Sequence, residues 1–306
     1  VVAGGLENDN RVDHSYAVGA AFGGVSARGT EQYEAMAVNV ASQVLAEGPE
    51  RDALMPCTPT GMTDAACARA FLAEYGQRLW RRPLTDEELT PLTAVASGAA
   101  TTLTDFYDGL EFGLVGLLIS PNFLYRVELG EANPAAATDD DAAALRFSSM
   151  EMASRLSYFL WNTTPDDDLL AAAATGALVD DAQLEAQVRR MLDDPRAREG
   201  VRAFFTEVFE LDRLSALLKD PEVFVHIDGD VGPSAREETL LTLEQNIFVE
   251  EGDYRDVFTT RTTFLNRKMA SIYSVPTPTR DGFGPYTFPD DAPRAGILTQ
   301  ASFLAL

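Results

Sequence analysis

The feature that most constrains the fold of this chain is a succession of apolar stripes with helical spacing, each bounded by capping or breaking residues. In the segment at about 30–47, Tyr33, Met36, Val40 and Val44 fall three or four residues apart. Residues with this spacing lie on one face of an α-helix, where they can pack against a core. The same spacing predicts further helices at about 63–80, 85–99, 103–120, 148–161, 164–176, 181–193, 195–211, 233–251 and 261–274. Because no alternating run indicates a sheet, we expect a mainly α fold of helices packed orthogonally or as bundles.

Changes in composition divide the chain into two contiguous helical halves with irregular segments at both ends. The stretch "GEANPAAATDDDAAA" at 130–144 is acidic and of low complexity, which is typical of a linker. A proline- and glycine-rich stretch follows from 274 and predicts a loop with, at most, a short strand. The expected parts are an irregular N-terminal segment (1–29), a first helical module (30–130), an acidic linker (131–144), a second helical module (145–275) and a third module (276–306) that starts but is truncated.

Three glycines interrupt the apolar segment at 103–120. Gly109, Gly113 and Gly116 are spaced by three and four residues and share one side of the expected helix. Each glycine costs a helix about 1 kcal/mol relative to alanine. We therefore expect a neighbouring helix to pack against this side at close range.

The overall composition indicates a globular protein and argues against two kinds of binding partner. The chain has 306 residues, of which 46% are apolar, enough to bury a core. It carries 48 acidic against 24 basic residues, a formal net charge of −24. Nucleic acids and anionic membranes need cationic surfaces, so neither is an expected partner. The longest apolar run, "FGLVGLLIS", is well short of the ~20 residues that a membrane-spanning helix requires.

The two cysteines predict a local disulfide. Cys57 and Cys67 are separated by nine residues that include Pro59 and Gly61, which favour a turn. A bond over this spacing would stabilise the fold by about 3 kcal/mol in the loop-entropy model. Two free buried thiols and a metal site remain as alternatives. A disulfide implies an oxidising compartment, so we expect the protein in the periplasm or outside the cell.

The stretch "RLWRRPLTDEEL" at 78–89 places three arginines around a tryptophan, as an anion-binding site would. A corner between two helices explains it as well: arginines near a helix end complement its carbonyl groups, Pro83 ends that helix and Thr85 caps the next. The acidic residues that follow offer the cations partners. An ion-pair anchor to another helix and a true anion site remain as alternatives. The structural signature of this corner consists of Arg81, Arg82, Pro83, Thr85 and Glu88.

The sequence does not identify a catalytic or cofactor-binding residue. It contains no nucleophile elbow, no phosphate-binding loop and no dinucleotide fingerprint. With only His14 and His226 it cannot form a histidine-rich metal site, and it has no C-x-x-C-H haem attachment motif. Paired carboxylates for acid and base catalysis could come from many places, for example Glu237 and Glu238, and nothing in the sequence selects a pair.

A weak candidate for a metal site lies at 228–239. Asp228 and Asp230 occupy the first and third positions of a segment that begins like a calcium loop. The sixth position is Pro233 where the loop needs glycine, and the twelfth is Thr239 where it needs a bidentate glutamate. We therefore expect no calcium at these residues.

Several blocks resemble one known family. They include "FLAEYGQRLWRRPLTDEEL", "GLLISPNFLYRVELG", "EMASRLSYFLWNTTPDDDLL", "TTFLNRKMASIYSVP" and "RAGILTQASFLAL". In this order they are similar to the large secreted proteins of planctomycetes and myxobacteria built from consecutive domains of unknown function, the 1595, 1592 and 1588 series. The resemblance covers residues 30–306 and implies work beside a c-type cytochrome module. This chain departs from that pattern because it lacks the haem motif, so the haem would belong to the parent protein or to a partner chain.

These observations favour a periplasmic or secreted helical scaffold segment of a larger, haem-associated redox or electron-transfer protein. In this interpretation the chain holds no cofactor itself, and its partner is another protein or the part of the same precursor beyond Leu306. One alternative is a carboxylate-based hydrolase acting on extracellular polysaccharide. It predicts a cleft with two inward acids within about 10 Å and a raised pKa on one of them. Another is a structural or adhesive extracellular subunit. Whether the chain is an enzyme stays open.

Overall fold

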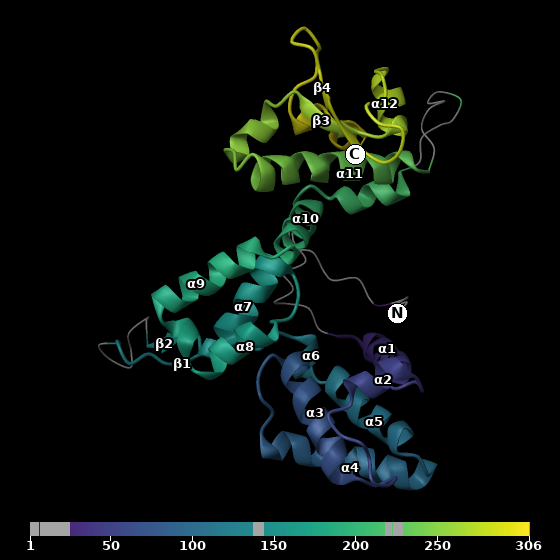
Figure 1. The fold of residues 1–306 in the computed structure, drawn as a ribbon, viewed down its shortest axis with the longest axis vertical. Coiled ribbons are helices and arrows are strands. Elements are labelled where there is room, and N and C mark those ends of the chain that lie inside the picture. Colours follow the sequence, from purple (N-terminus) through teal and green to yellow (C-terminus); the bar gives the residue numbers. More distant parts are fainter. Residues whose placement is uncertain (1–5, 7–24, 137–143, 218–221, 223–228, 306) are drawn as a thin grey trace. The chain divides into compact units, whose positions relative to one another are not determined.

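The structure is a computed structural model that describes residues 6, 25–136, 144–217, 222 and 229–305 (Figure 1). Helices make up most of these residues, which confirms the expected mainly α fold. The chain forms two compact units. Among the described residues, unit 1 extends to Asp193 and unit 2 begins at Asp194. None of the described helices combines the length and apolar character needed to cross a bilayer.

Unit 1 is built from helices apart from one short pair of strands. Its elements are α1 (Ala27–Val44), α2 (Pro49–Leu54), α3 (Ala65–Trp80), α4 (Asp86–Leu103), α5 (Phe106–Leu118), α6 (Pro121–Leu124), β1 (Glu131–Ala132), β2 (Leu145–Arg146), α7 (Ser149–Trp161), α8 (Asp167–Ala174), η2 (Ala177–Val179) and α9 (Asp181–Asp193).

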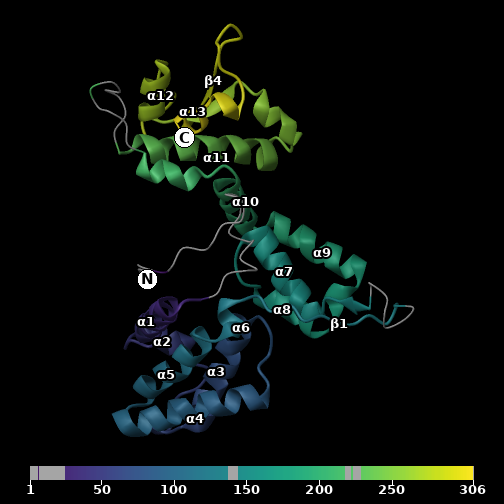
Figure 2. The same cartoon turned by 180° about the vertical axis from the view of Figure 1, so that it is seen from behind.

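The core of unit 1 lies where α1, α3, α4 and α5 pack together (Figure 2). Phe71, Leu72 and Leu117 are fully buried there. The expected close approach of a helix to the glycines of α5 is present. A Cβ at Gly109 would lie only 2.4 Å from the Cβ of Ala100 on α4. Because no side chain fits in that space, the glycine allows the backbones of α4 and α5 to pack at close range.

The cysteines are joined as expected, by a Cys57–Cys67 disulfide. The bond ties the loop after α2 to the first turn of α3, where Cys67 is buried. At that turn Asp64 caps the helix by accepting a hydrogen bond from the backbone N–H of Cys67 at 3.0 Å. The disulfide and the cap therefore fix the same helix end.

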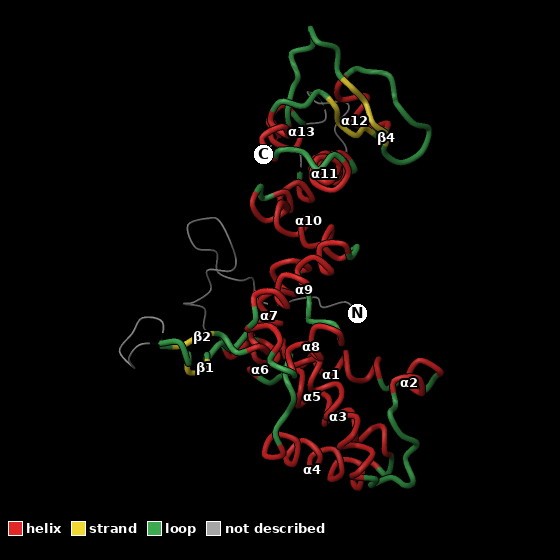
Figure 3. The backbone as a smooth tube through the Cα atoms, turned by 60° about the vertical axis from the view of Figure 1, so that its left-hand side comes forward, coloured by secondary structure: helices red, strands yellow, loops and turns green. Residues whose placement is uncertain are grey.

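Unit 2 surrounds a central helix, α11 (Figure 3). Its elements are α10 (Arg196–Val208), η3 (Leu211–Ala216), α11 (Val231–Glu244), η4 (Gln245–Val249), η5 (Tyr254–Phe258), β3 (Thr262–Leu265), α12 (Arg267–Tyr273), β4 (Gly284–Thr287), η6 (Ile297–Thr299) and α13 (Ala301–Ala305). Leu240 and Leu243 of α11 are buried in a core to which β3, α12 and η6 contribute.

The predicted helix at 261–274 is wrong over its first turn. Residues 262–265 form β3, which pairs antiparallel with β4 and sets Thr263 opposite Tyr286. Thr263 and Leu265 are buried, whereas Thr262 and Phe264 are partly exposed, the alternation of a half-buried strand. The residues of β4 lie 19 to 25 residues after their partners in β3, so a helical window could not detect the pairing. Asn266 then caps α12 by accepting a hydrogen bond from the N–H of Met269 at 2.9 Å.

Two further details differ from the sequence-based expectation. The first two residues of the expected linker, 131–144, form a small sheet with the two residues that follow it, in which Glu131 pairs with Arg146. The division between compact units falls after Asp193, inside the expected second module of 145–275. Residues 149–193 belong to unit 1 because their contacts are there. For example, Thr164 donates a hydrogen bond to the carbonyl of Arg78 at 3.0 Å.

Candidate functional site

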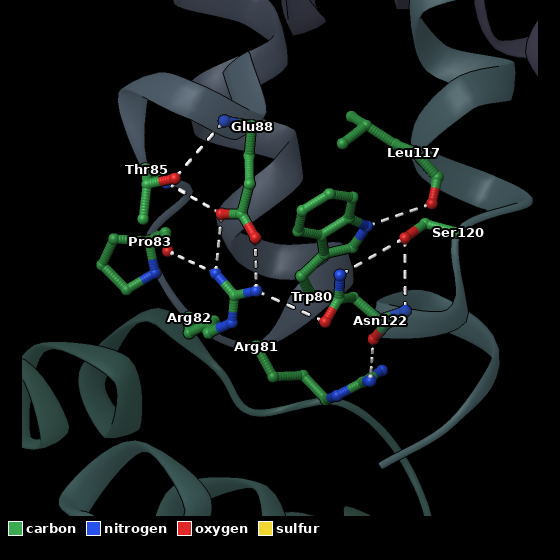
Figure 4. A network of polar contacts seen from close by, with 9 residues as sticks. All are labelled: Trp80, Arg81, Arg82, Pro83, Thr85, Glu88, Leu117, Ser120 and Asn122. Atoms are coloured by element: carbon green, nitrogen blue, oxygen red, sulfur yellow. Dashed lines mark hydrogen bonds and ion pairs between the residues drawn. The ribbon is translucent and has the colours of Figure 1, made fainter. Parts of the chain in front are cut away.

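The arginine-rich corner of unit 1 is held by an ion pair within the motif (Figure 4). Arg82 donates to both carboxylate oxygens of Glu88, at 2.9 and 2.7 Å. Glu88 also accepts from the backbone N–H of Thr85 at 2.9 Å, and Thr85 accepts from the N–H of Glu88 at 3.3 Å, which completes a capping box. The hydrogen bonds from Arg82 lower the pKa of Glu88 to about 2, against the opposing effect of burial.

Arg81 donates to the carbonyl of Leu79 at the end of its own helix at 3.1 Å, as expected of an arginine at that end, and it also reaches a second helix end. It is only 5% exposed, and it ends α3 in the left-handed conformation with φ of 60°. Its guanidinium donates to backbone carbonyls at and after the short helix α6, including Phe123 at 3.3 Å and Tyr125 at 2.8 Å. These carbonyls would otherwise lack partners at the end of that helix. Arg81 therefore joins two helix ends instead of pairing with a carboxylate.

The remaining arginine and the tryptophan complete the corner. Arg78 forms exposed ion pairs with Glu74 at 3.5 Å and with Asp167 of α8 at 3.1 Å. The Nε1 of Trp80 donates to the carbonyl of Leu117 at 3.1 Å. All three guanidinium groups thus have partners within the protein. The geometry favours the corner interpretation, with Arg78 serving as the anchor to another helix.

The weak calcium candidates do not come together as a described site. Asp228 lies outside the described residues, and Asp230 is at the N-cap of α11. Among the described residues, no group of three or more His, Cys, Asp or Glu side chains is arranged to hold a metal ion.

Unit 2 contains a fully buried acid that the sequence did not single out, Glu238 on α11. Its Oε1 accepts a hydrogen bond from the hydroxyl of Thr263, and its Oε2 accepts one from the hydroxyl of Tyr273, both at 2.7 Å. Burial raises the pKa of Glu238 to about 7, although both hydrogen bonds and Arg294 act in the opposite direction. Such a group changes charge near neutral pH.

Gln300 extends this centre to the segment before α13. Its Nε2 donates to the hydroxyls of Thr242 at 3.0 Å and Thr263 at 3.1 Å, and its Oε1 accepts from Thr239 at 2.8 Å. The hydroxyl of Tyr273 also accepts from the backbone N–H of Ala301 at 2.7 Å. One connected set of hydrogen bonds therefore joins α11, β3, α12 and α13.

A cavity borders Glu238, and its size limits what the centre can do. Its volume is about 10 Å³, which is the space of one water molecule. Glu238 is the one acidic residue among its described lining. Arg294, also in the lining, lies with its guanidinium carbon 4.5 Å from the ring centroid of Tyr273. The cavity has room for a water beside a titratable carboxyl and not for a sugar.

The sequence does contain a signal for Glu238. Val231, Ala235, Glu238 and Thr242 are spaced by four, three and four residues, so the acid occupies the buried stripe of α11. Its neighbour Glu237 lies about 100° around the helix and pairs with Arg202 instead. The two acids offered as a possible catalytic pair therefore have separate environments.

Two family models match the chain. Residues 67–128 match PSD5, described as a protein of unknown function (DUF1595), and residues 147–275 match PSD4, described as a protein of unknown function (DUF1592). Both belong to the series that the sequence blocks resemble. The corner lies within the first match, and Glu238, Thr263 and Tyr273 lie within the second. No curated protein and no solved structure is similar enough to count as a match.

Proposed function

Because the chain contains two domains of this unknown-function series in tandem, we propose that it is a helical scaffold segment of a larger extracytoplasmic protein. In this proposal the redox cofactor, a c-type haem, is bound by another module of the parent protein or by a partner chain. The chain described here positions that module and does not itself transform a substrate.

The proposal rests on one observation: the buried and partly buried charged side chains of both units form hydrogen bonds that join one secondary structure element to another. Arg81 joins the ends of α3 and α6, and Arg82 fixes the turn before α4. Glu238 joins α11 to β3 and α12. Buried polar groups that satisfy one another in this way fix a unique arrangement of helices, which is what a scaffold requires.

The cysteines support both parts of the proposal. A disulfide persists in the periplasm or outside the cell and is rare in the cytosol, so the Cys57–Cys67 bond supports an extracytoplasmic location. Covalent haem attachment needs two free thiols in a C-x-x-C-H motif. Both thiols of the chain are already used, so its residues do not fit a c-type haem. The haem of the proposal therefore belongs elsewhere.

The hydrolase alternative has one supporting observation, the raised pKa of Glu238. It lacks the required geometry, because the cavity at Glu238 has room for only about one water molecule and no second described acid lines it. A structural or adhesive subunit without a redox partner differs from the scaffold proposal only in the haem. The decisive test must therefore detect the haem module.

The test is an absorption spectrum of the intact protein purified from its source, followed by cross-linking mass spectrometry. We expect a Soret band, a c-type spectrum after alkaline pyridine treatment, and cross-links between this chain and the haem-bearing module. A preparation without a Soret band would contradict the redox part and favour the structural subunit. A Soret band without cross-links to this chain would contradict the scaffold part.

A further inference from the structure

Residues 125–129 of unit 1, between α6 and β1, run along α7 as an extended segment. Near its start, the guanidinium carbon of Arg126 lies 4.9 Å from the ring centroid of Tyr158. At its end, the N–H of Leu129 donates to Glu151 at 2.6 Å. Tyr158 and Glu151 are seven residues apart on α7, a rise of about 10 Å. Because only three residues of the segment cover this distance, they must be extended like a β-strand.

The two faces of this segment differ in character. Arg126 and Glu128 point towards α7, since Arg126 covers the ring of Tyr158 and Glu128 pairs with Arg155 at 2.8 Å. Side chains alternate between the faces of an extended chain. The opposite face is therefore apolar, and its three side chains are all exposed to solvent: Tyr125, Val127 and Leu129.

The two edges of the segment differ as well. Backbone groups of alternate residues point to the same edge of a strand. On one edge, the carbonyl of Tyr125 accepts from Arg81 at 2.8 Å and the N–H of Leu129 donates to α7. The other edge carries the N–H and C=O groups of Arg126 and Glu128, for which the described part of the chain offers no hydrogen-bond partner. An exposed edge of this kind is a template for another strand.

The segment is complementary to itself in the antiparallel direction. When Val127 lies on a two-fold axis, Arg126 of one copy faces Glu128 of the other, and opposite charges in facing positions favour pairing. Arg126 and Glu128 also carry the free backbone groups, so they would form the hydrogen-bonded pairs and Val127 the closer, non-hydrogen-bonded pair. We propose that this edge binds a second copy of the chain, with residues 125–129 of the two copies forming an antiparallel sheet.

The contact expected from this pairing is small. It consists of the backbone hydrogen bonds of two residue pairs and one row of exposed apolar side chains, less than the ~1,200 Å² of a standard interface. We therefore expect a weak dimer with a Kd on the order of 100 µM. The inference does not depend on the proposed haem module, because the paired edge lies entirely within this chain.

The experiment is sedimentation velocity of the full chain in about 0.15 M salt, which screens the repulsion between two chains of net charge −24. Val127→Glu and Val127→Lys each place like charges opposite one another on the axis and should weaken dimerisation about tenfold. An equimolar mixture of these variants should regain the dimer, with a Kd within about threefold of wild type. Val95→Lys is the matched control, because Val95 on α4 is 51% exposed against 47% for Val127.

Cysteine cross-linking tests the register independently, because both native cysteines are already bonded to each other. The Cα atoms of a non-hydrogen-bonded pair lie about 4.5 Å apart, a separation that a disulfide can bridge. Mild oxidation should therefore join two copies of Val127→Cys but not of Val95→Cys.

Three results would overturn the proposal. One is a wild-type chain that stays monomeric up to about five times the expected Kd. Another is a mixture of Val127→Glu and Val127→Lys that dimerises no better than either variant alone. The third is equal cross-linking of the two cysteine variants.

Discussion

Two glutamates of this molecule each accept strong hydrogen bonds, yet their acidities move in opposite directions. Glu88 in unit 1 has a pKa lowered to about 2, and Glu238 in unit 2 has one raised to about 7. Glu88 receives its bonds from the guanidinium of Arg82 and from a backbone N–H, with its side chain 27% exposed. Glu238 receives its bonds from two neutral hydroxyls and is fully buried.

The difference indicates that the charge of the donor and the loss of water decide the direction in which the pKa of a hydrogen-bonded acid moves. A cation within hydrogen-bond distance stabilises the carboxylate, whereas loss of water destabilises it. At Glu238 the nearby charged group is Arg294, which donates to the carbonyl of Thr299 and acts on the acid only at a distance. Desolvation therefore decides the pKa of Glu238, and the ion pair with Arg82 decides the pKa of Glu88.

The largest expected effect comes from removing the buried acid. Glu238→Ala leaves the hydroxyls of Thr263 and Tyr273 without their acceptor and opens a cavity. We expect a loss of about 3–5 kcal/mol in the free energy of unfolding. Glu238→Gln keeps the volume and one acceptor and should cost only about 1 kcal/mol. Chemical denaturation followed by circular dichroism measures both. A loss for Glu238→Gln as large as that for Glu238→Ala would mean that an amide cannot replace the carboxyl as the acceptor for Thr263 and Tyr273.

The pH dependence of stability should show the raised pKa directly. Burial raises the pKa of Glu238 to about 7 in the folded chain, against the ordinary 4.5 of a glutamate. Its favourable contribution is complete below pH 4.5 and is lost as the pH rises to 7, because the unfolded chain ionises first. A difference of this size corresponds to about 3 kcal/mol. Denaturation between pH 4 and 8 should show this slope in the wild type and not in Glu238→Gln. Parallel curves would contradict the raised pKa.

The sequence predicts what is local and misses what is distant. Thr85 and Glu88 of the capping box are three residues apart, and Arg82 and Glu88 are six residues apart. The corner could therefore be predicted from a short stretch of sequence. The contact of Arg81 with the carbonyl of Leu79 is local and was expected at a helix end. Its other carbonyl partners lie 41 to 44 residues later, and no local pattern predicts them.

The buried centre is distant in the same sense. Thr263 and Tyr273 are 25 and 35 residues from Glu238. Thr263 lies on β3, which pairs with β4. Because the sequence predicted a helix at these residues, it could not indicate that Thr263 is a hydrogen-bond partner of Glu238. The helical stripe of α11 still placed an acid among buried residues. That signal predicts the burial of Glu238, but its partners and its pKa require the tertiary structure.

An intermediate effect is expected at Arg81, the buried charged side chain of the corner. Arg81→Lys keeps the charge but loses the planar fork that reaches several carbonyls at once. We expect a loss of about 2 kcal/mol in the free energy of unfolding. Arg78→Lys is the matched control, because the ion pairs of Arg78 are exposed and worth at most about 0.5 kcal/mol. Equal effects of the two substitutions would show that the carbonyl contacts of Arg81 are unimportant.

The smallest expected effect tests the other half of the comparison. Glu88→Gln removes the charge that pairs with Arg82 but keeps an oxygen for the N–H of Thr85. Because the pair is partly exposed, we expect a loss of about 1 kcal/mol at pH 7. The sign of the pH dependence is opposite to that of Glu238. The contribution of Glu88 is present above pH 4.5 and is lost as the pH falls towards 2, because the folded carboxylate resists protonation.

The stabilising contribution of Glu88, and with it the cost of Glu88→Gln, should therefore shrink on acidification. The contribution of Glu238 grows on the same change, because this acid binds a proton more readily in the folded than in the unfolded chain. Glu87→Gln, which alters the preceding carboxylate of the same helical turn, is the control. Denaturation of both variants at pH 7 and at pH 3 separates the ion pair from the general effect of charge near a helix end. If Glu87→Gln loses as much stability as Glu88→Gln, the favourable field of the helix N-terminus, and not Arg82, stabilises the charge of Glu88.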